Sequence, residues 1–186
     1  MKNRKYIAFI LALIALVFFL IPTKEDSVSY ITNKGKIHGT YYHVTYLQPE
    51  GIDLKDSIEA EMRRFEKSLS VFDSASVISK INRNECMLTD TLFEIMYNEA
   101  FAVSELSGGA FDITVAPLVN VWGFGFRSSQ FPSDKQIDSI LAFVGYRKIA
   151  LNDHTIYKDD ARIMLDAGAI AKGYSVDIIA ELLSQS

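Results

Sequence analysis

The sequence predicts an α+β fold in which helices pack on a mixed sheet. Three observations favour this class: segments whose apolar residues recur every three or four positions, short segments rich in Tyr, Val and Thr, and two adjacent strands joined by a tight turn. The 186 residues are 49% hydrophobic and 23% charged, an ordinary globular composition that argues against a disordered chain. A chain of this length suggests one domain with a buried core.

The first 22 residues are predicted to be a signal peptide or signal anchor rather than part of the domain. Lys2, Arg4 and Lys5 precede an apolar run over residues 6–21, which Pro22 ends. A basic start followed by a short apolar run is typical of such export signals. The basic flank is expected to stay in the cytoplasm, which would place the rest of the chain outside it. A buried core helix is the alternative.

A tether, a strand and a helix are predicted next. Residues 23–36 are polar and are assigned to the tether, and residues 37–186 to the domain. Tyr, Val and Thr make residues 38–47 the first predicted strand. Asp53 is the expected cap of a helix whose apolar residues recur at spacings of three and four, namely Leu54, Ile58, Met62, Phe65 and Leu69.

Two further helices and a group of strands follow. Thr89 or Asp90 is expected to cap a helix that runs to residue 106, where the glycines at 108 and 109 stop it. Ser133 and Gln136 have the spacing of a capping box for a helix that ends near residue 143. The last third is predicted to contain strands over residues 147–151, 155–158 and 162–165, with a turn at residues 152–153, and a helix over residues 173–183.

Composition and motifs exclude several classes of function. A formal net charge of −4, with no basic cluster beyond the N-terminus, disfavours a nucleic-acid partner. Cys86 is the one cysteine, so an internal disulfide framework and a multi-cysteine zinc site are excluded. The three histidines do not have metalloprotease spacing, and the G-x-S-x-G motif of serine hydrolases does not occur.

The segment over residues 165–173 is the most informative candidate for a site, because it lies between a predicted strand and a predicted helix. Its small residues would let main-chain N–H groups approach an anion, and the helix N-terminus would add its positive end. Lys172 offers a cation for a phosphate, and Asp166 offers a carboxylate for a hydrogen bond or a metal ion. A plain tight connection, with Gly168 present for close packing, is the alternative.

Residues 108–117 form a second candidate. An exposed Phe111–Asp112 pair after the two glycines would offer a ligand a stacking face and a carboxylate. The aromatic and glycine residues over 122–126 would suit the floor of a site for a planar ligand. The alternatives are structural: a helix stop followed by a core strand in the first case, and core residues followed by a loop in the second.

Two weaker candidates complete the set. They are residues 38–41, at the start of the first predicted strand, and residues 69–74, which are followed by Asn82. A single histidine such as His38 is more often a surface or core residue than a ligand.

Taken in order, these four segments resemble the ApbE family of FAD:protein FMN transferases. The matching residues are His38 to Tyr41, Leu69 to Phe72 with Asp73, Ser74 and Asn82, Gly108 to Asp112 through Pro117, and Leu165 to Tyr174. The resemblance covers the chain from about residue 36 to its end, and it implies an ApbE-like fold.

The resemblance implies flavin chemistry. Members of the family bind FAD with a divalent metal ion, usually Mg²⁺, break its pyrophosphate and attach FMN through a phosphoester to a Thr or Ser hydroxyl of a target protein. The target is typically a subunit of a membrane redox pump. Positioning and charge neutralisation provide most of the catalysis in such phosphoryl transfers. Many members act outside the cytoplasmic membrane, so we expect the chain at the periplasmic face of the inner membrane, either anchored or released.

The family pattern also assigns contacts residue by residue. Contacts with FAD are implied for His38, Phe72, Ala110, Phe111, Asp112, Asp166 and Lys172. Ala169 would offer its main-chain carbonyl to the metal, a hard oxygen ligand of the kind that Mg²⁺ prefers. His38 departs from the methionine common at its position, and Phe72 keeps the aromatic ring without a hydroxyl.

The end of the chain departs from the family pattern. Family members continue with a His–Asp–Pro–Gly type segment and a later Asp/Thr cluster that supplies side-chain metal ligands, and Ser186 comes before either. The sequence therefore predicts an inactive N-terminal part of a transferase, truncated at its C-terminus. An exported, non-catalytic flavin-binding or interaction module and an exported domain without a flavin role are the alternatives.

Overall fold

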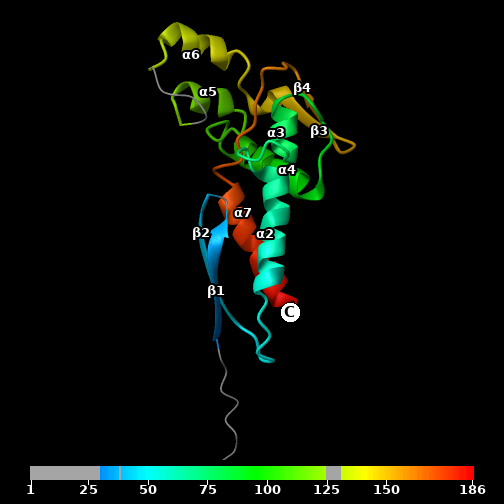
Figure 1. Cartoon of the computed structure of the whole chain (residues 1–186). Coiled ribbons are helices and arrows are strands. Elements are labelled where there is room, and N and C mark those ends of the chain that lie inside the picture. Colours follow the sequence, from blue (N-terminus) through cyan, green and yellow to red (C-terminus); the bar gives the residue numbers. More distant parts are fainter. Residues whose placement is uncertain (1–29, 38, 125–130) are drawn as a thin grey trace, which may run out of the picture.

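The computed structural model describes residues 30–37, 39–124 and 131–186 (Figure 1). The predicted signal segment and His38 lie outside the described residues, as does part of the 122–126 stretch. The helices are α2 (Lys55–Leu69), α3 (Val77–Asn82), α4 (Thr91–Leu106), α5 (Ala116–Val121), α6 (Asp134–Leu141) and α7 (Ala171–Ser184). The strands are β1 (Tyr30–Ile37), β2 (Thr40–Leu47), β3 (Ile149–Asn152) and β4 (Thr155–Lys158), with a short 3-10 helix at Tyr146–Lys148.

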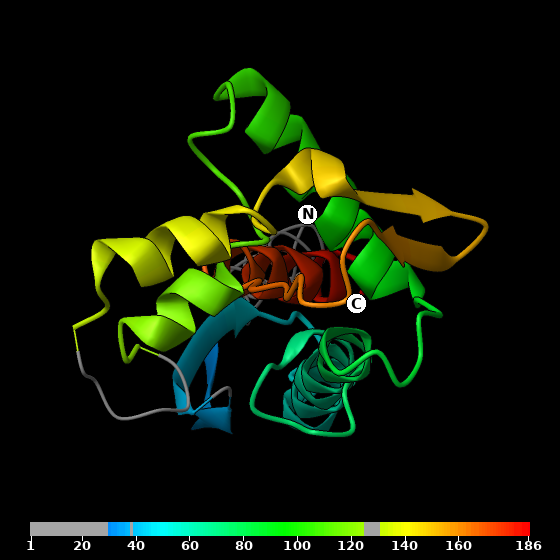
Figure 2. The same cartoon turned by 90° about the horizontal axis from the view of Figure 1, so that it is seen from above.

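The predicted α+β class with packed helices is confirmed. In the described residues the strands form two separate antiparallel pairs, β1–β2 and β3–β4, where the sequence suggested one mixed sheet. One parallel bridge joins Val115 to Met164. The β1–β2 hairpin lies beside α2 and α7, α3 and α4 lie near the β3–β4 hairpin, and α5 and α6 project from the far end (Figure 1). Seen from above, these elements surround α7 (Figure 2).

Strand β1 corrects the predicted tether, because residues 30–36 form a strand rather than a linker. Asn33 is 4% exposed, and its Nδ2 donates to Oδ1 of Asp53 at 2.8 Å. Ile31 faces Tyr46 across the hairpin. The polar composition therefore did not indicate this strand, in which the buried Asn33 side chain forms a hydrogen bond with a residue twenty positions later in the chain.

Helix α2 begins close to the predicted position, with its apolar residues on the buried side. Ile58, Met62, Phe65 and Leu69 are all buried. Asp53 precedes the N-cap residue Leu54 and accepts a hydrogen bond at Oδ1 from the amide of Lys55 at 2.9 Å. Asp53 is therefore not the N-cap residue that the sequence predicted, but stands one position before it and bonds to the first residue of the helix.

Helices α4 and α6 confirm their predicted capping signals. The Asp90 side chain accepts from the amide of Phe93 at 2.8 Å, and Gly108 and Gly109 end α4 with φ values of 61° and 85°, a conformation that glycine adopts without penalty. Ser133 and Gln136 form the capping box of α6. That helix ends at Leu141, two residues before the expected end.

The last third differs from the prediction in three places. Strand β4 has the predicted bounds, whereas residues 146–148 form a 3-10 turn before β3. The turn of this hairpin lies at Asp153 and His154, both with positive φ, one residue later than expected. Residues 162–165 form no strand, because their main chain bonds mainly to side chains from elsewhere in the chain.

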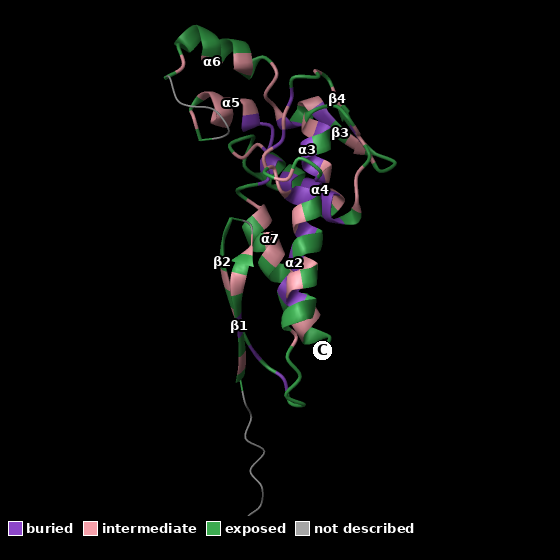
Figure 3. Cartoon of the chain, in the orientation of Figure 1, coloured by how far each residue is buried: buried purple, intermediate pink, exposed green. Residues whose placement is uncertain are grey.

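The core has two parts, visible as the purple segments of Figure 3. The larger part lies among α2, α3, α4, β3 and β4 and includes the fully buried Ile163, Leu165 and Ala167. The smaller part joins Tyr46, Ile58, Met62 and Ile179 between the first hairpin, α2 and α7. No helix among the described residues is long and apolar enough to cross a membrane.

Candidate functional site

A small pocket brings together two of the four predicted segments. Its volume is about 100 Å³, and one wall is the end of α2 with the loop that follows it, while the other is the start of α7. The lining residues are Phe65, Leu69, Ser70, Val71, Phe72, Gly168, Ala171 and Lys172. The Phe72 side chain is 79% exposed at the rim, so its ring presents an aromatic face to an incoming ligand.

The segment before α7 forms a tight turn around Asp166. Oδ1 of this half-buried carboxylate accepts from the amide of Gly168 at 2.7 Å. The carbonyl of Ala167 accepts from the amides of Ile170 and Ala171 at 3.0 and 2.7 Å. The turn thereby leaves Ala169 and Lys172 exposed beside the N-terminus of α7, which favours a negatively charged ligand.

The segment over residues 108–117 lies next to Asp166 through the main chain. The amide of Asp166 donates to the carbonyl of Ile113 at 2.7 Å, and the Val115–Met164 bridge continues this contact. The alternative of a core strand after the helix stop is not what forms, because residues 116–121 are the helix α5. Ala110 is exposed, whereas Phe111 packs partly against the larger core.

The Asp112 carboxylate is engaged inside the protein. Its Oδ1 accepts from the amide and the hydroxyl of Thr114 at 2.7 and 2.6 Å, and its Oδ2 accepts from the amide of Tyr146 at 2.7 Å. The Thr114 hydroxyl, fully buried, accepts in turn from the amide of Gly145 at 2.7 Å. Asp112 therefore fixes the loop over residues 110–114 against residues 145–146.

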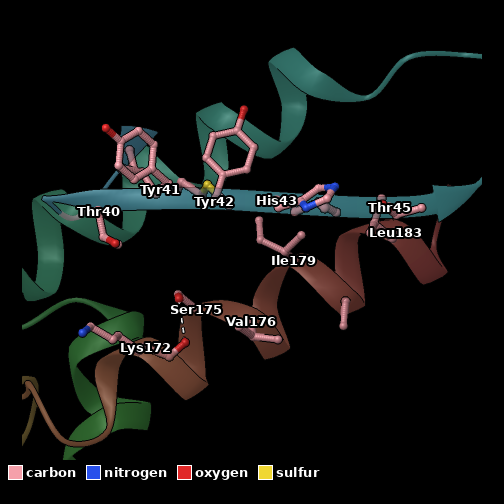
Figure 4. Close-up of a pocket in the computed structure, with 14 residues that line it drawn as sticks. Thr40, Tyr41, Tyr42, His43, Thr45, Lys172, Ser175, Val176, Ile179 and Leu183 are labelled. Atoms are coloured by element: carbon pink, nitrogen blue, oxygen red, sulfur yellow. Dashed lines mark hydrogen bonds between the residues drawn. The ribbon is translucent and has the colours of Figure 1, made fainter. Parts of the chain in front are cut away.

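A larger groove of about 500 Å³ begins where the small pocket ends. It runs between β2 and α7, and Lys172 lines both cavities. Figure 4 shows β2 along one side and α7 along the other, with Thr40 and Lys172 toward the same end. Thr40 and Tyr41, from the predicted segment over residues 38–41, thus line this groove, whereas His38 itself lies outside the described residues.

The profile of the ApbE family matches residues 38–186, which is most of the chain. The chain belongs to the ApbE family. Among curated proteins it is similar to the FAD:protein FMN transferase of Vibrio cholerae serotype O1, with 30% identity over 92% of this chain and 54% of the relative. It is also similar to the FAD:protein FMN transferase of Haemophilus influenzae, with 32% identity over 98% of this chain and 56% of the relative.

Solved ApbE structures share the fold. The flavin transferase ApbE from Vibrio cholerae has a TM-score of 0.79 and 29% identity, over 85% of this chain and 54% of that one. The apo form of the Pseudomonas stutzeri flavinyl transferase ApbE also has a TM-score of 0.79, with 28% identity over 85% of this chain and 53% of that one. The chain spans about half the length of the curated relatives that it matches.

A metal ion has few candidate ligands in this part of the ApbE fold. The described residues contain no group of three or more His, Cys, Asp or Glu side chains that could bind a metal ion. Ala169 is exposed and can offer a main-chain carbonyl, and Asp166 lies three residues before it. One carbonyl and one carboxylate fall short of the several oxygen ligands of a dedicated Mg²⁺ site.

Three residues support the candidate site through bonds that sequence reasoning did not predict: Asn82 and Thr114, which lie in or beside the predicted segments, and Lys158, which carried no signal. Asn82 bonds to the main chain of Leu165, and Thr114 joins Asp112 to Gly145. Lys158 donates from Nζ to the carbonyls of Ile81 and Ile163 at 2.6 and 2.9 Å, and burial lowers the pKa of its ammonium to about 8. Their partners are distant in sequence, so spacing alone does not reveal them.

Proposed function

We propose that this chain is part of an FAD:protein FMN transferase, an enzyme that cleaves FAD and attaches FMN to a Thr or Ser hydroxyl of a target protein. One observation carries the proposal. In a chain of the ApbE family, the segments of Phe72 and of Gly168 to Lys172 meet at one pocket. Relatives named FAD:protein FMN transferase match nearly the whole chain, which supports the same activity.

The residues of the pocket suit the two ends of a flavin nucleotide. The exposed ring of Phe72 can stack on the planar flavin, and the apolar wall beside it excludes water. The exposed ammonium of Lys172 can contact the pyrophosphate, which would then lie near the first turn of α7. Asp166 can accept a hydrogen bond from the ligand, and Ala110, Phe111 and Asp112 remain predicted contacts on the adjoining loop.

The proposed reaction is a transfer of one phosphoryl group. The oxygen of the target hydroxyl forms a bond to the phosphorus on the FMN side of the pyrophosphate. The bond from that phosphorus to the bridging oxygen breaks, AMP leaves, and the hydroxyl proton is released. The protein contributes by aligning the two reactants and by placing positive charge near the pyrophosphate.

We propose that Mg²⁺ takes part, with the Ala169 carbonyl as one ligand. Bound Mg²⁺ would neutralise negative charge on the pyrophosphate. The transfer is proposed for a protein of the relatives' full length, since this chain spans about half of it. The 186 residues alone are expected to bind FAD without catalysing the transfer.

We further propose an exported protein at the periplasmic face of the inner membrane, held there or released through its first 22 residues. A basic start and an apolar run support this location. The matching target would be a subunit of a membrane redox pump, presented on the same side of the membrane.

The test is transfer of flavin to a protein. The full-length protein is incubated with FAD and a target protein, with and without Mg²⁺, and the target is examined for flavin fluorescence after denaturing electrophoresis. We expect a fluorescent target only when Mg²⁺ is present. A label that persists after the acceptor Thr or Ser is replaced by Ala, or no label in any condition, would contradict the proposal.

A further inference from the structure

Helix α3 connects the two walls of the small pocket. At its C-terminal end, Nδ2 of Asn82 donates to the carbonyl of Leu165 at 2.9 Å, and Oδ1 of Asn82 accepts from the amide of Leu165 at 2.7 Å. At its N-terminal end, the hydroxyls of Ser76 and Ser79 both donate to the carbonyl of Ser70, at 2.7 and 3.2 Å. Ser70 lines one wall, and Leu165 and Asp166 lead into the segment that gives Gly168, Ala171 and Lys172 to the other.

These bonds are costly to lose because one partner of each is buried in the protein, although Ser70 and Asn82 are only half-buried. Ser76 and Ser79 are 0% and 5% exposed, and the Leu165 side chain is fully buried. A buried main-chain group left without a partner destabilises its local conformation. The residues before Asp166 are not part of a strand, so the paired bonds from Asn82 take the place of a strand partner at Leu165.

The orientation of Asp166 follows from its neighbours. Asn82 fixes the residue before it, and the Ile113 carbonyl fixes its own amide at 2.7 Å. The Asp166 side chain is therefore aimed by bonds that fix the peptide unit before it and by the bond of its own Oδ1 to the amide of Gly168. A small rotation at Leu165 would move the Asp166 carboxylate relative to Phe72. Phe72 lies on the opposite wall, which Ser76 and Ser79 hold through the carbonyl of Ser70.

We propose that α3 is a brace for flavin binding, in which Asn82 is a positioning residue that acts through Asp166. This inference rests on the proposed function, since it assumes that the pocket binds FAD. Asn82 holds Leu165 and the Ser76–Ser79 pair holds Ser70, so α3 sets the separation of the two main-chain segments that carry Asp166 and Phe72. Asn82 itself does not line the pocket.

The experiment measures the FAD dissociation constant by flavin fluorescence for the wild type, Asn82→Asp and Ile78→Val. Asn82→Asp keeps the acceptor for the Leu165 amide and replaces the donor to its carbonyl with an oxygen. Ile78 is a fully buried residue of the same helix, and Ile78→Val removes one methylene without touching Leu165. We expect Asn82→Asp to weaken FAD binding about tenfold, and Ile78→Val to leave it unchanged.

A double-mutant cycle separates positioning from general loss of structure. In an Asp166→Asn background, Asn82→Asp is expected to cause little further weakening, because the group that it positions has already changed. The same factor of weakening in both backgrounds would overturn the inference, as would wild-type affinity in Asn82→Asp. If the wild type does not bind FAD, the proposed function fails and the brace fails with it.

A second variant covers the case in which Asn82→Asp does not fold. Ser79→Ala removes one of the two hydroxyls that hold Ser70 at the other end of the brace. We expect it to weaken FAD binding several-fold, by the loss of one buried hydrogen bond, while thermal unfolding stays cooperative. Unchanged FAD affinity in Ser79→Ala would contradict the brace.

Discussion

Oδ1 of Asp166 accepts a hydrogen bond from the amide of Gly168 at 2.7 Å, and a Cβ atom on Gly168 would lie 2.9 Å from the same oxygen. That separation is shorter than side chains tolerate, so any larger residue at position 168 must displace the carboxylate. The φ angle of Gly168 is not in the left-handed region. The glycine is required by its neighbour and not by its own backbone conformation.

Gly168→Ala is therefore expected to weaken FAD binding about tenfold while the protein stays folded, because the displaced group is the half-buried end of a side chain and not main chain. Flavin fluorescence measures the affinity, and thermal unfolding checks the fold. Gly173→Ala is the matched control, since a Cβ there meets nothing within 4 Å and alanine favours the helix. Equal FAD affinity in Gly168→Ala and the wild type would remove this turn from the site.

Lys172 borders both cavities, so its charge is expected to act on the phosphates of the ligand. Lys172→Gln should weaken FAD binding about tenfold, by loss of a charge-assisted hydrogen bond worth ~1.5 kcal/mol. Riboflavin, which has no phosphate, should bind the variant and the wild type alike. The dissociation constants of FAD and riboflavin are measured by titration of the wild type and the variant, at low and at high salt. A variant that loses riboflavin affinity as much as FAD affinity would show that Lys172 shapes the pocket instead.

Asp112 is expected to contribute mainly to stability. Asp112→Asn puts an amide nitrogen opposite the Thr114 groups or the Tyr146 amide, which leaves a donor without an acceptor and should cost about 2 kcal/mol of unfolding free energy. Urea unfolding measures the change, with the exposed Asp138→Asn of α6 as control. Unchanged stability together with lost FAD affinity would assign the carboxylate to the ligand.

Lys158 gives a pH dependence of stability with a defined sign. Burial lowers the pKa of its ammonium to about 8, whereas a lysine in the unfolded chain keeps its proton to about pH 10.4. The unfolded state therefore binds more protons between these values, and the contribution of Lys158 to stability rises as pH increases from 8 toward 10. Denaturant unfolding of wild type and Lys158→Met should show this rise only in the wild type, and parallel curves would contradict it.

Helices α2, α4, α6 and α7 were predictable because their signals are local, whereas the six-residue helices α3 and α5 were not predicted. Asp90 and the Ser133–Gln136 pair act within three residues, and the glycines after Leu106 end α4 through their own backbone conformation. Strand β1 was not predicted because its polar residues show no apolar alternation. One of them, Asn33, is nevertheless buried, because its side chain forms a hydrogen bond with Asp53. Local composition cannot show a partner that folding brings from another element.

The loops of the candidate site were predictable from the sequence, but the hydrogen bonds that hold these loops in place were not. Glycines and charged residues mark the segments around Asp112 and Asp166, and the family resemblance joins them. The bonds between Asn82 and Leu165 link positions 83 residues apart, and those from Asp112 to Tyr146 link positions 34 apart. Asp112 illustrates the difference, because its carboxylate binds main-chain groups that only the fold brings near.

The most direct test of the account is a titration of FAD with the protein, followed by flavin fluorescence, in the wild type and in Phe72→Ala. The site predicts a saturable change in fluorescence for the wild type and clearly weaker binding for Phe72→Ala, since the exposed ring would stack on the flavin. Fluorescence that does not change at any protein concentration, with or without Mg²⁺, would contradict a flavin site in this chain. Equal affinity of the two proteins would place the flavin away from the pocket.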